Sequence, residues 1–128
     1  MNITELRLPA EWEPQSAVLL AWPHAGTDWA ARLDAVEGTC AALISAVTRF
    51  ESAIVCMPDA EVAKYAKERL RQAGADLARV RLVEIPYDDT WLRDSGPITL
   101  RDNGRFALLD FRFTGWGGKF EEIGRAHV

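Results

Sequence analysis

The order of the secondary structure is decided by residues 52–85, which read SAIVCMPDAEVAKYAKERLRQAGADLARVRLVEI. The apolar run at residues 52–57 predicts a buried strand, and the alternation over residues 79–85 predicts another. Between them, Asp59 is a plausible N-cap and Gly74 a plausible C-terminal stop for an amphipathic helix. These residues therefore predict a strand–helix–strand unit.

A similar unit precedes this one. Residues 16–22, SAVLLAW, form a short apolar run that predicts a strand and ends at a proline. Apolar residues then recur at helical spacing and predict one buried helix face, with Thr27 or Asp28 as its cap. The residues of this stripe are Trp29, Leu33, Val36, Cys40, Leu43, Val47 and Phe50. Alternating strands and helices of these lengths are typical of a mainly parallel α/β layer.

The second half of the chain has a different pattern. Residues 98–101 and 106–113 predict two antiparallel strands joined by a turn at Asp102-Asn103-Gly104, because Asn-Gly favours two-residue hairpin turns. No linker separates the halves, so we expect one continuous unit. Several large apolar residues here are expected to be exposed when the chain is alone, which favours aggregation. They are Phe106, Leu108, Phe111, Phe113 and Trp116.

Composition excludes several classes of protein. The chain has 128 residues, of which 48% are hydrophobic, with 15 Lys+Arg, 19 Asp+Glu and a net charge of −4. This composition is globular, and the acidic balance predicts neither nucleic-acid nor membrane partners. Cys40 and Cys56 form no CxxC pair, and the first residues do not resemble a secretory signal, so we expect a cytoplasmic protein.

The densest polar motif is PYDDTWLRDSGP at residues 86–97. It follows a predicted strand, and open α/β sheets bind ligands at the carboxyl ends of their strands. Asp94 has two oxygens for a guanidinium, and Trp91 has a ring face to cover it. The alternative is structural: Arg93 and Asp94 would stabilise a turn while Trp91 packs in the core.

A glycine-rich segment, FTGWGGKF at residues 113–120, is the second candidate. Its glycines permit positive φ angles, so the segment predicts either a plain turn or a ligand-lining loop that carries Trp116. Neither His24 nor His127 has a partner at metal-ligand spacing, which predicts no metal site. The residues thus suggest half of a cation pocket without a catalytic nucleophile.

Four motifs carry a resemblance to the agmatine deiminases and their relatives, the bacterial peptidyl-arginine deiminases of the guanidino-group-modifying superfamily. They are PAEWEP at 9–14, LAWP at 20–23, TWLRDSGP at 90–97 and GWGGK at 115–119. The resemblance implies a pentein α/β propeller, of which this chain would supply about the first blade and the start of the next. It also implies hydrolysis of agmatine to N-carbamoylputrescine and ammonia, towards putrescine, without a metal or organic cofactor.

The resemblance also implies residue roles. Asp94 matches the aspartate that binds the guanidinium, Trp91 matches the tryptophan beside the substrate, and Trp116 falls in a loop that lines the same pocket. The family's nucleophilic cysteine, its general-base histidine and a second aspartate are expected downstream of residue 128. Cys40 and Cys56 are poor substitutes because buried thiols ionise weakly. We therefore expect an inactive N-terminal fragment at residues 1–121, lacking the rest of its propeller and open to homo-oligomer formation.

Residues 122–128, EIGRAHV, continue no family motif, and a common sequencing-adapter sequence would encode them. We expect this tail to be non-native and His127 to have no function. Three rival interpretations remain open at this stage. They are a peptidyl-arginine deiminase-like fragment, a non-catalytic αβ module that binds a cationic ligand, and a receiver-like regulatory domain. The last rests only on Asp88-Asp89 after a strand and is disfavoured by the hairpin.

Overall fold

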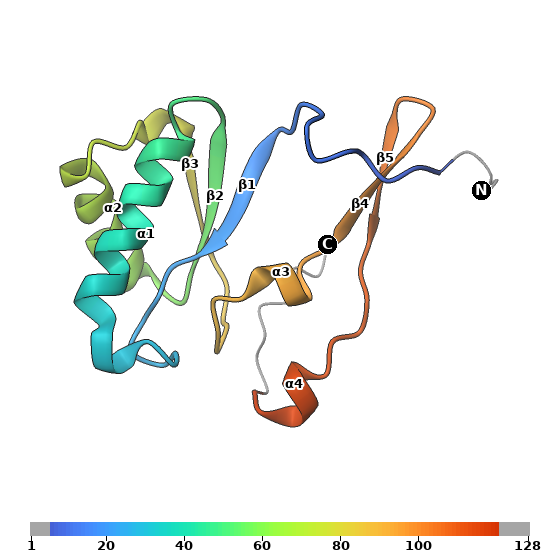
Figure 1. The fold of residues 1–128 in the computed structure, drawn as a ribbon. Helices are drawn as coiled ribbons and strands as arrows, with labels where there is room; N and C mark the ends of the chain where they lie inside the picture. Colours follow the sequence, from blue (N-terminus) through green and yellow to red (C-terminus); the bar gives the residue numbers. More distant parts are fainter. Residues whose placement is uncertain (1–5, 121–128) are drawn as a thin grey trace.

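A three-stranded parallel sheet forms the centre of the first half, in a computed structural model that describes residues 6–120 (Figure 1). Its strands are β1 (Ala17–Ala21), β2 (Ser52–Met57) and β3 (Val80–Glu84), in the order β1-β2-β3. The register places Leu20 beside Val55, and Val55 beside Leu82. The three predicted strands are confirmed, each within one residue of its expected ends.

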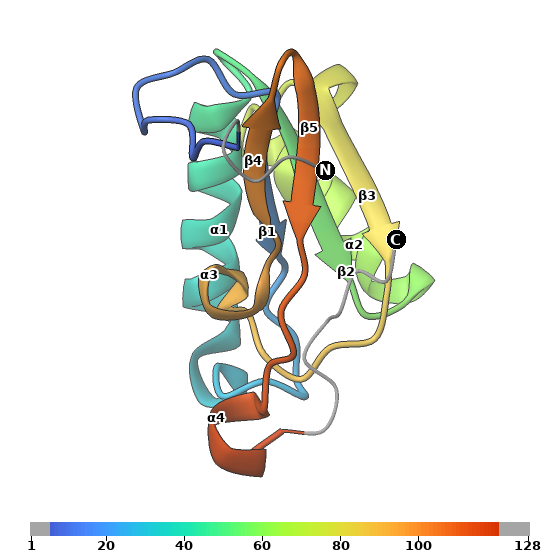
Figure 2. The ribbon, with the colours of Figure 1, turned by 90° about the vertical axis from the view of Figure 1, so that its right-hand side faces the viewer.

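Two helices cover the same face of this sheet (Figures 1 and 2). They are α1 (Leu33–Val47), preceded by the 3₁₀ turn η2 (Ala30–Arg32), and α2 (Ala60–Gln72), followed by η3 (Leu77–Arg79). The Asp59 side chain accepts a 2.8 Å hydrogen bond from the N–H of Val62, so the predicted cap of α2 is confirmed. Gly74 follows the helix with a φ of +78°, as a C-terminal glycine should.

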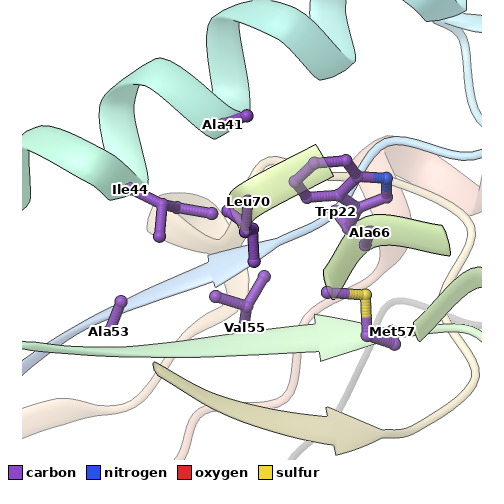
Figure 3. Close-up of a cluster of buried hydrophobic side chains, with 8 residues drawn as sticks. All are labelled: Trp22, Ala41, Ile44, Ala53, Val55, Met57, Ala66 and Leu70. Atoms are coloured by element: carbon purple, nitrogen blue, oxygen red, sulfur yellow. The ribbon is translucent and has the colours of Figure 1, made fainter. Parts of the chain in front are cut away.

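The core lies between these helices and the sheet (Figure 3). Ala53, Val55 and Met57 are buried at alternate positions of β2, since successive strand side chains point to opposite faces. Ile44 from α1 and Leu70 from α2 meet them from above, and the Trp22 indole fills one end of the cluster. This packing supplies a rigid platform at the carboxyl ends of the strands.

The predicted apolar stripe of α1 is only partly confirmed, because Cys40 and Val47 pack against the core but are half-buried. The buried residues of the helix are Glu37, Ala41 and Ile44, whereas Leu43 and Phe50 are exposed. The Glu37 carboxylate points inward because the Trp22 indole N–H and the Tyr65 hydroxyl both donate to it, each at 3.2 Å.

The flank of α1 that carries the predicted stripe also lies beside an apolar groove. Val36, Cys40 and Leu43 line this groove together with Trp29 and Trp91. The cap prediction for this helix is wrong. The residue before α1 is Arg32, which makes no side-chain cap, while Thr27 donates to the carbonyl of His24 in an earlier turn.

On α2, nearly half of the surface of Tyr65 is exposed. Its hydroxyl reaches Glu37 from the rim of the core. Inside the same helix, Ala66 and Leu70 are buried. Among residues 6–120, no helix has the length and apolar character needed to cross a membrane.

The second half contains α3 (Leu92–Ser95), the antiparallel strands β4 (Ile98–Asp102) and β5 (Arg105–Leu109), and α4 (Gly115–Gly118). The predicted hairpin is confirmed, with Asn103 and Gly104 both at positive φ in its turn, although the second strand ends at Leu109 rather than at residue 113. The hairpin lies on the side of the sheet away from α1 and α2 (Figures 1 and 2).

Backbone hydrogen bonds between Arg7 and Arg101 tie the N-terminal segment to β4. The expected exposed apolar residues of this half are exposed, with one exception. That exception is Phe113, which is half-buried because it packs edge-on against Trp116 with ring centroids 4.9 Å apart. The expectations for residues 122–128 and His127 lie outside the described residues.

Candidate functional site

The three side chains singled out by sequence line one cavity of about 390 Å³. Trp91 and Asp94 come from the segment after β3, at the carboxyl end of the strand, and Trp116 comes from α4. Four further residues complete the lining: Asp28, Asp89, Lys119 and Phe120. This volume falls within the usual range for small-molecule sites.

Asp94 is held directly by Trp116. The indole N–H of Trp116 donates to Oδ2 of Asp94 over 3.2 Å, across 22 residues of sequence. Trp91 is 56% exposed, so the alternative that it packs in the core is wrong. A carboxylate between two accessible indole rings can bind a planar cation through N–H donation and ring stacking.

Trp91 packs against a second tryptophan. Its ring centroid lies 6.3 Å from that of Trp29, and the Trp29 indole N–H donates to the hydroxyl of Thr90 at 2.9 Å. These contacts join the turn before α1 to the segment after β3. They fix the direction in which Trp91 leaves the backbone.

Asp89 is the most buried carboxylate of the cavity, with 6% of its surface exposed. Its Oδ1 accepts from the N–H of Thr90 at 2.7 Å, a local turn that leads the chain into Trp91. Within residues 6–120, this N–H is the only donor seen on the Asp89 carboxylate. Sequence reasoning treated Asp89 only as half of an Asp-Asp pair and did not place it in the pocket.

The glycine-rich segment folds into a left-handed turn, which explains its composition. Gly115, Trp116, Gly117 and Gly118 have φ values of +63°, +54°, +80° and +86°. A Cβ on Gly115 would lie 2.5 Å from the carbonyl oxygen of Phe120, so a side chain there has no room. Trp116 alone accepts this conformation with a side chain, and backbone strain of this kind clusters at functional sites.

Asp28 and Lys119 close one side of the cavity with an ion pair, in which Nζ and Oδ2 are 2.7 Å apart across 91 residues. Asp28 had been expected as a helix cap, so its place here was missed. Lys119 was visible in the GWGGK motif but had no assigned role. Among the described lining residues, three carboxylates and one ammonium give a formal charge of −2.

Neither cysteine is suited to nucleophilic attack. Burial raises the pKa of the Cys40 thiol to about 11, and Glu37 adds to the shift. Burial also raises the pKa of Cys56. Both ring nitrogens of His24 are occupied by backbone contacts. Nδ1 accepts a hydrogen bond from the N–H of Gly26, and Nε2 lies 3.0 Å from the carbonyl oxygen of Tyr87.

The described part of the chain therefore offers a binding pocket and no nucleophile–base pair. Among the same residues, no group of three or more His, Cys, Asp or Glu side chains is arranged to hold a metal ion.

Comparison with known proteins identifies the family of the chain. The Porphyromonas-type peptidyl-arginine deiminase family matches residues 7–127. The chain belongs to this family. The agmatine deiminase of Stutzerimonas stutzeri strain A1501 is 37% identical over 113 residues, and that of Pseudomonas aeruginosa strain LESB58 is 36% identical over the same length. In both, the match covers 88% of this chain and 29% of the relative, so the chain spans less than a third of these proteins.

Solved structures give the same result. A variant of the C. jejuni agmatine deiminase with substrate bound superposes with a TM-score of 0.77 at 28% identity. The superposition covers 91% of this chain and 33% of that structure. The mixed α/β fold is therefore shared with agmatine deiminases, and the resemblance seen in the four motifs is confirmed.

Proposed function

We propose that this chain is the N-terminal part of an agmatine deiminase and forms half of its guanidinium pocket. In the complete enzyme, agmatine and water would give N-carbamoylputrescine and ammonia in a cytoplasmic route to putrescine. Residues 1–121 would be part of a single pentein propeller domain, about its first blade and the start of the next. The observation that carries the proposal is the shared cavity of Asp94, Trp91 and Trp116.

Each side chain has a role that its chemistry supports. Asp94 would accept two parallel N–H bonds from the guanidinium, and the charge on both partners strengthens them. Trp91 and Trp116 would cover the planar cation and exclude water, which strengthens the ion pair further. The Trp116 N–H would hold Asp94 in place before the ligand arrives.

The chain would not turn over substrate by itself. The thiolate that attacks the guanidinium carbon and the histidine that activates water are proposed to lie in the part of the enzyme that this chain does not span. Cys40 and Cys56 are excluded as replacements by their burial and raised pKa values. The Asp94 pocket thus binds and orients, and the covalent step requires the remainder.

The first test is agmatine binding, followed by tryptophan fluorescence at sub-micromolar protein. Asp94→Asn keeps the shape and removes the charge, so affinity should fall by roughly ten- to a hundredfold, as for a lost charge-assisted bidentate contact. The control is Asp110→Asn, an exposed aspartate outside the cavity lining, which should bind as the unchanged chain does. Equal losses in both variants would show that the pocket is not the site.

The second test concerns the remainder of the enzyme. The genomic sequence downstream of the Lys119 codon should continue in frame through a His-x-Asp segment to a glycine-rich segment ending in cysteine. The protein expressed from that longer frame should release ammonia from agmatine, and Asp94→Asn should abolish most of that activity. A stop codon directly after Val128 would contradict the deiminase proposal for this chain.

A further inference from the structure

The Asp28–Lys119 ion pair lines the same cavity as Asp94. Trp91 and Trp116, the two rings proposed to cover the guanidinium, line this cavity as well. Lys119 is one residue beyond the left-handed turn that carries Trp116, so the pair and the Asp94–Trp116 contact share one short segment. The pair therefore lies within reach of whatever is bound to Asp94.

The pair determines which charges the cavity presents. Lys119 is the one cation among the described residues that line the space, and its Nζ is 2.7 Å from Oδ2 of Asp28. An anionic ligand would have to displace Asp28 before it could form an ion pair with Lys119. Asp89 adds a buried carboxylate that no cation within residues 6–120 pairs with.

We propose that the Asp28–Lys119 pair is the specificity element of this pocket, selecting guanidines whose tail ends in an amine over those whose tail carries a carboxylate. This inference rests on the proposed guanidinium pocket and names the tail that it accepts. With the pair intact, the lining residues within 6–120 have a net charge of −2, which complements a dication.

An amine tail can also replace Lys119 on Asp28. One ammonium then exchanges for another, and more than half of each side chain of the pair is exposed, so water stabilises the released lysine. A carboxylate tail has no equivalent exchange, because Asp28 repels it and already holds Lys119. The geometry thus favours an agmatine-like ligand over an arginine-like one.

The test compares three ligands by tryptophan fluorescence in 20 mM salt. Agmatine has a cationic tail, butylguanidine a neutral tail, and Nα-acetylarginine a carboxylate. The unchanged chain should bind agmatine tightest and acetylarginine weakest. Asp28→Asn removes the partner of Lys119 and frees its ammonium, so the agmatine-to-acetylarginine affinity ratio should fall about tenfold. Lys119→Gln removes the cation, so the ratio should rise.

A charge swap provides the matched control. The double variant Asp28→Lys with Lys119→Asp keeps the ion pair and the net charge of the lining, so it should restore much of the lost ratio. All ratios should shrink in 150 mM salt, because screening weakens interactions between exposed charges. Circular dichroism checks that each variant is folded, and both positions are at the surface.

The outcomes separate the two proposals. An unchanged ratio in Asp28→Asn, with the Asp94→Asn loss intact, overturns the specificity role and leaves the guanidinium pocket standing. If all three ligands bind but the longer gene product releases no ammonia from agmatine, the deiminase activity is overturned. The specificity role of the pair then stands or falls with the change of the agmatine-to-acetylarginine affinity ratio in Asp28→Asn. Failure of all three ligands to bind the unchanged chain overturns both.

Discussion

The layer formed by β1, α1, β2, α2 and β3 and the segment that follows it differ in where their apolar side chains lie. In the layer, Ile44, Val55 and Leu70 are fully buried between helices and sheet. In the hairpin, Phe106 and Phe111 are about two-thirds exposed. The layer has its own core, whereas the later segment carries much of the pocket without one. Stability and binding therefore depend on different parts of the chain.

The largest effect should come from the layer core. Leu70→Ala would leave a cavity among fully buried neighbours and should lower the free energy of unfolding by roughly 2–5 kcal/mol. Leu108→Ala is the matched change in the hairpin, where the side chain is more than half exposed, and should shift stability by about 0.5 kcal/mol or less. Urea unfolding followed by circular dichroism measures both. Equal losses would mean that the two regions share one core.

The second effect concerns association. The exposed hairpin residues should make the isolated chain self-associate, because contiguous apolar surface favours contact between molecules. Replacing Phe106 and Phe111 by serine should weaken self-association by about tenfold or more, given the usual free energy of burying a phenylalanine. Light scattering after size-exclusion chromatography provides the measurement.

Phe50→Ser is the control for that experiment. Phe50 is a phenylalanine of the layer that is even more exposed, at 84%, but it lies at the end of α1 and outside the hairpin. Its replacement should leave the association unchanged. A monodisperse monomer with a sharp cooperative melt for the unchanged chain would contradict the expectation altogether.

Local signals explain which parts of the fold the sequence could predict. Asp59, Gly74 and the Asn103-Gly104 pair each act through their own backbone neighbours, so their roles are readable from a few residues. The burial of Glu37 is different, because its two donors come from Trp22 and Tyr65 on other elements. An apolar stripe drawn from spacing alone has no means of placing a glutamate inside.

The site also combines residues that are close in the sequence with residues that only the fold brings together. Trp91 and Asp94 are close in one motif, and the fold places Trp116 in the same cavity. Asp28 and Lys119 are 91 residues apart, and their contact exists only once the left-handed turn has formed. Positive φ at a tryptophan is not a property that composition reveals. The contact between Asp28 and Lys119 could therefore not be predicted from the sequence.

A third prediction tests whether the turn serves binding rather than stability. Gly115→Ala forces a Cβ against the carbonyl of Phe120 and strains a residue at positive φ, so the turn should move and agmatine affinity should fall about fivefold. The urea midpoint of the layer should stay unchanged. Gly104→Ala is the control: its φ is +84° but no atom lies within 4 Å of the added Cβ. It should strain the hairpin turn and leave agmatine binding intact.

The smallest effect is a pH dependence of stability, confined to the contact between the N-terminal segment and β4. Hydrogen bonds from Arg7, with smaller contributions from Ala10 and Arg101, lower the pKa of Glu13 to about 2. A carboxyl with a lowered folded-state pKa stabilises the fold above its ordinary pKa near 4.5. That contribution declines as the pH falls towards 2. Glu13→Gln should remove this transition.

Glu68 on α2 is the matched group in the layer, because the Arg71 side chain lowers its pKa to about 2 as well. NMR titration of carboxyl resonances and of the Arg101 amide separates the two sites. Protonation of Glu13 should shift the Arg101 amide, since Arg101 donates to Glu13 and shares backbone bonds with Arg7. Protonation of Glu68 should leave that amide unmoved. A common midpoint at both sites and at Arg101 would instead indicate cooperative acid unfolding, in which the two regions lose structure together.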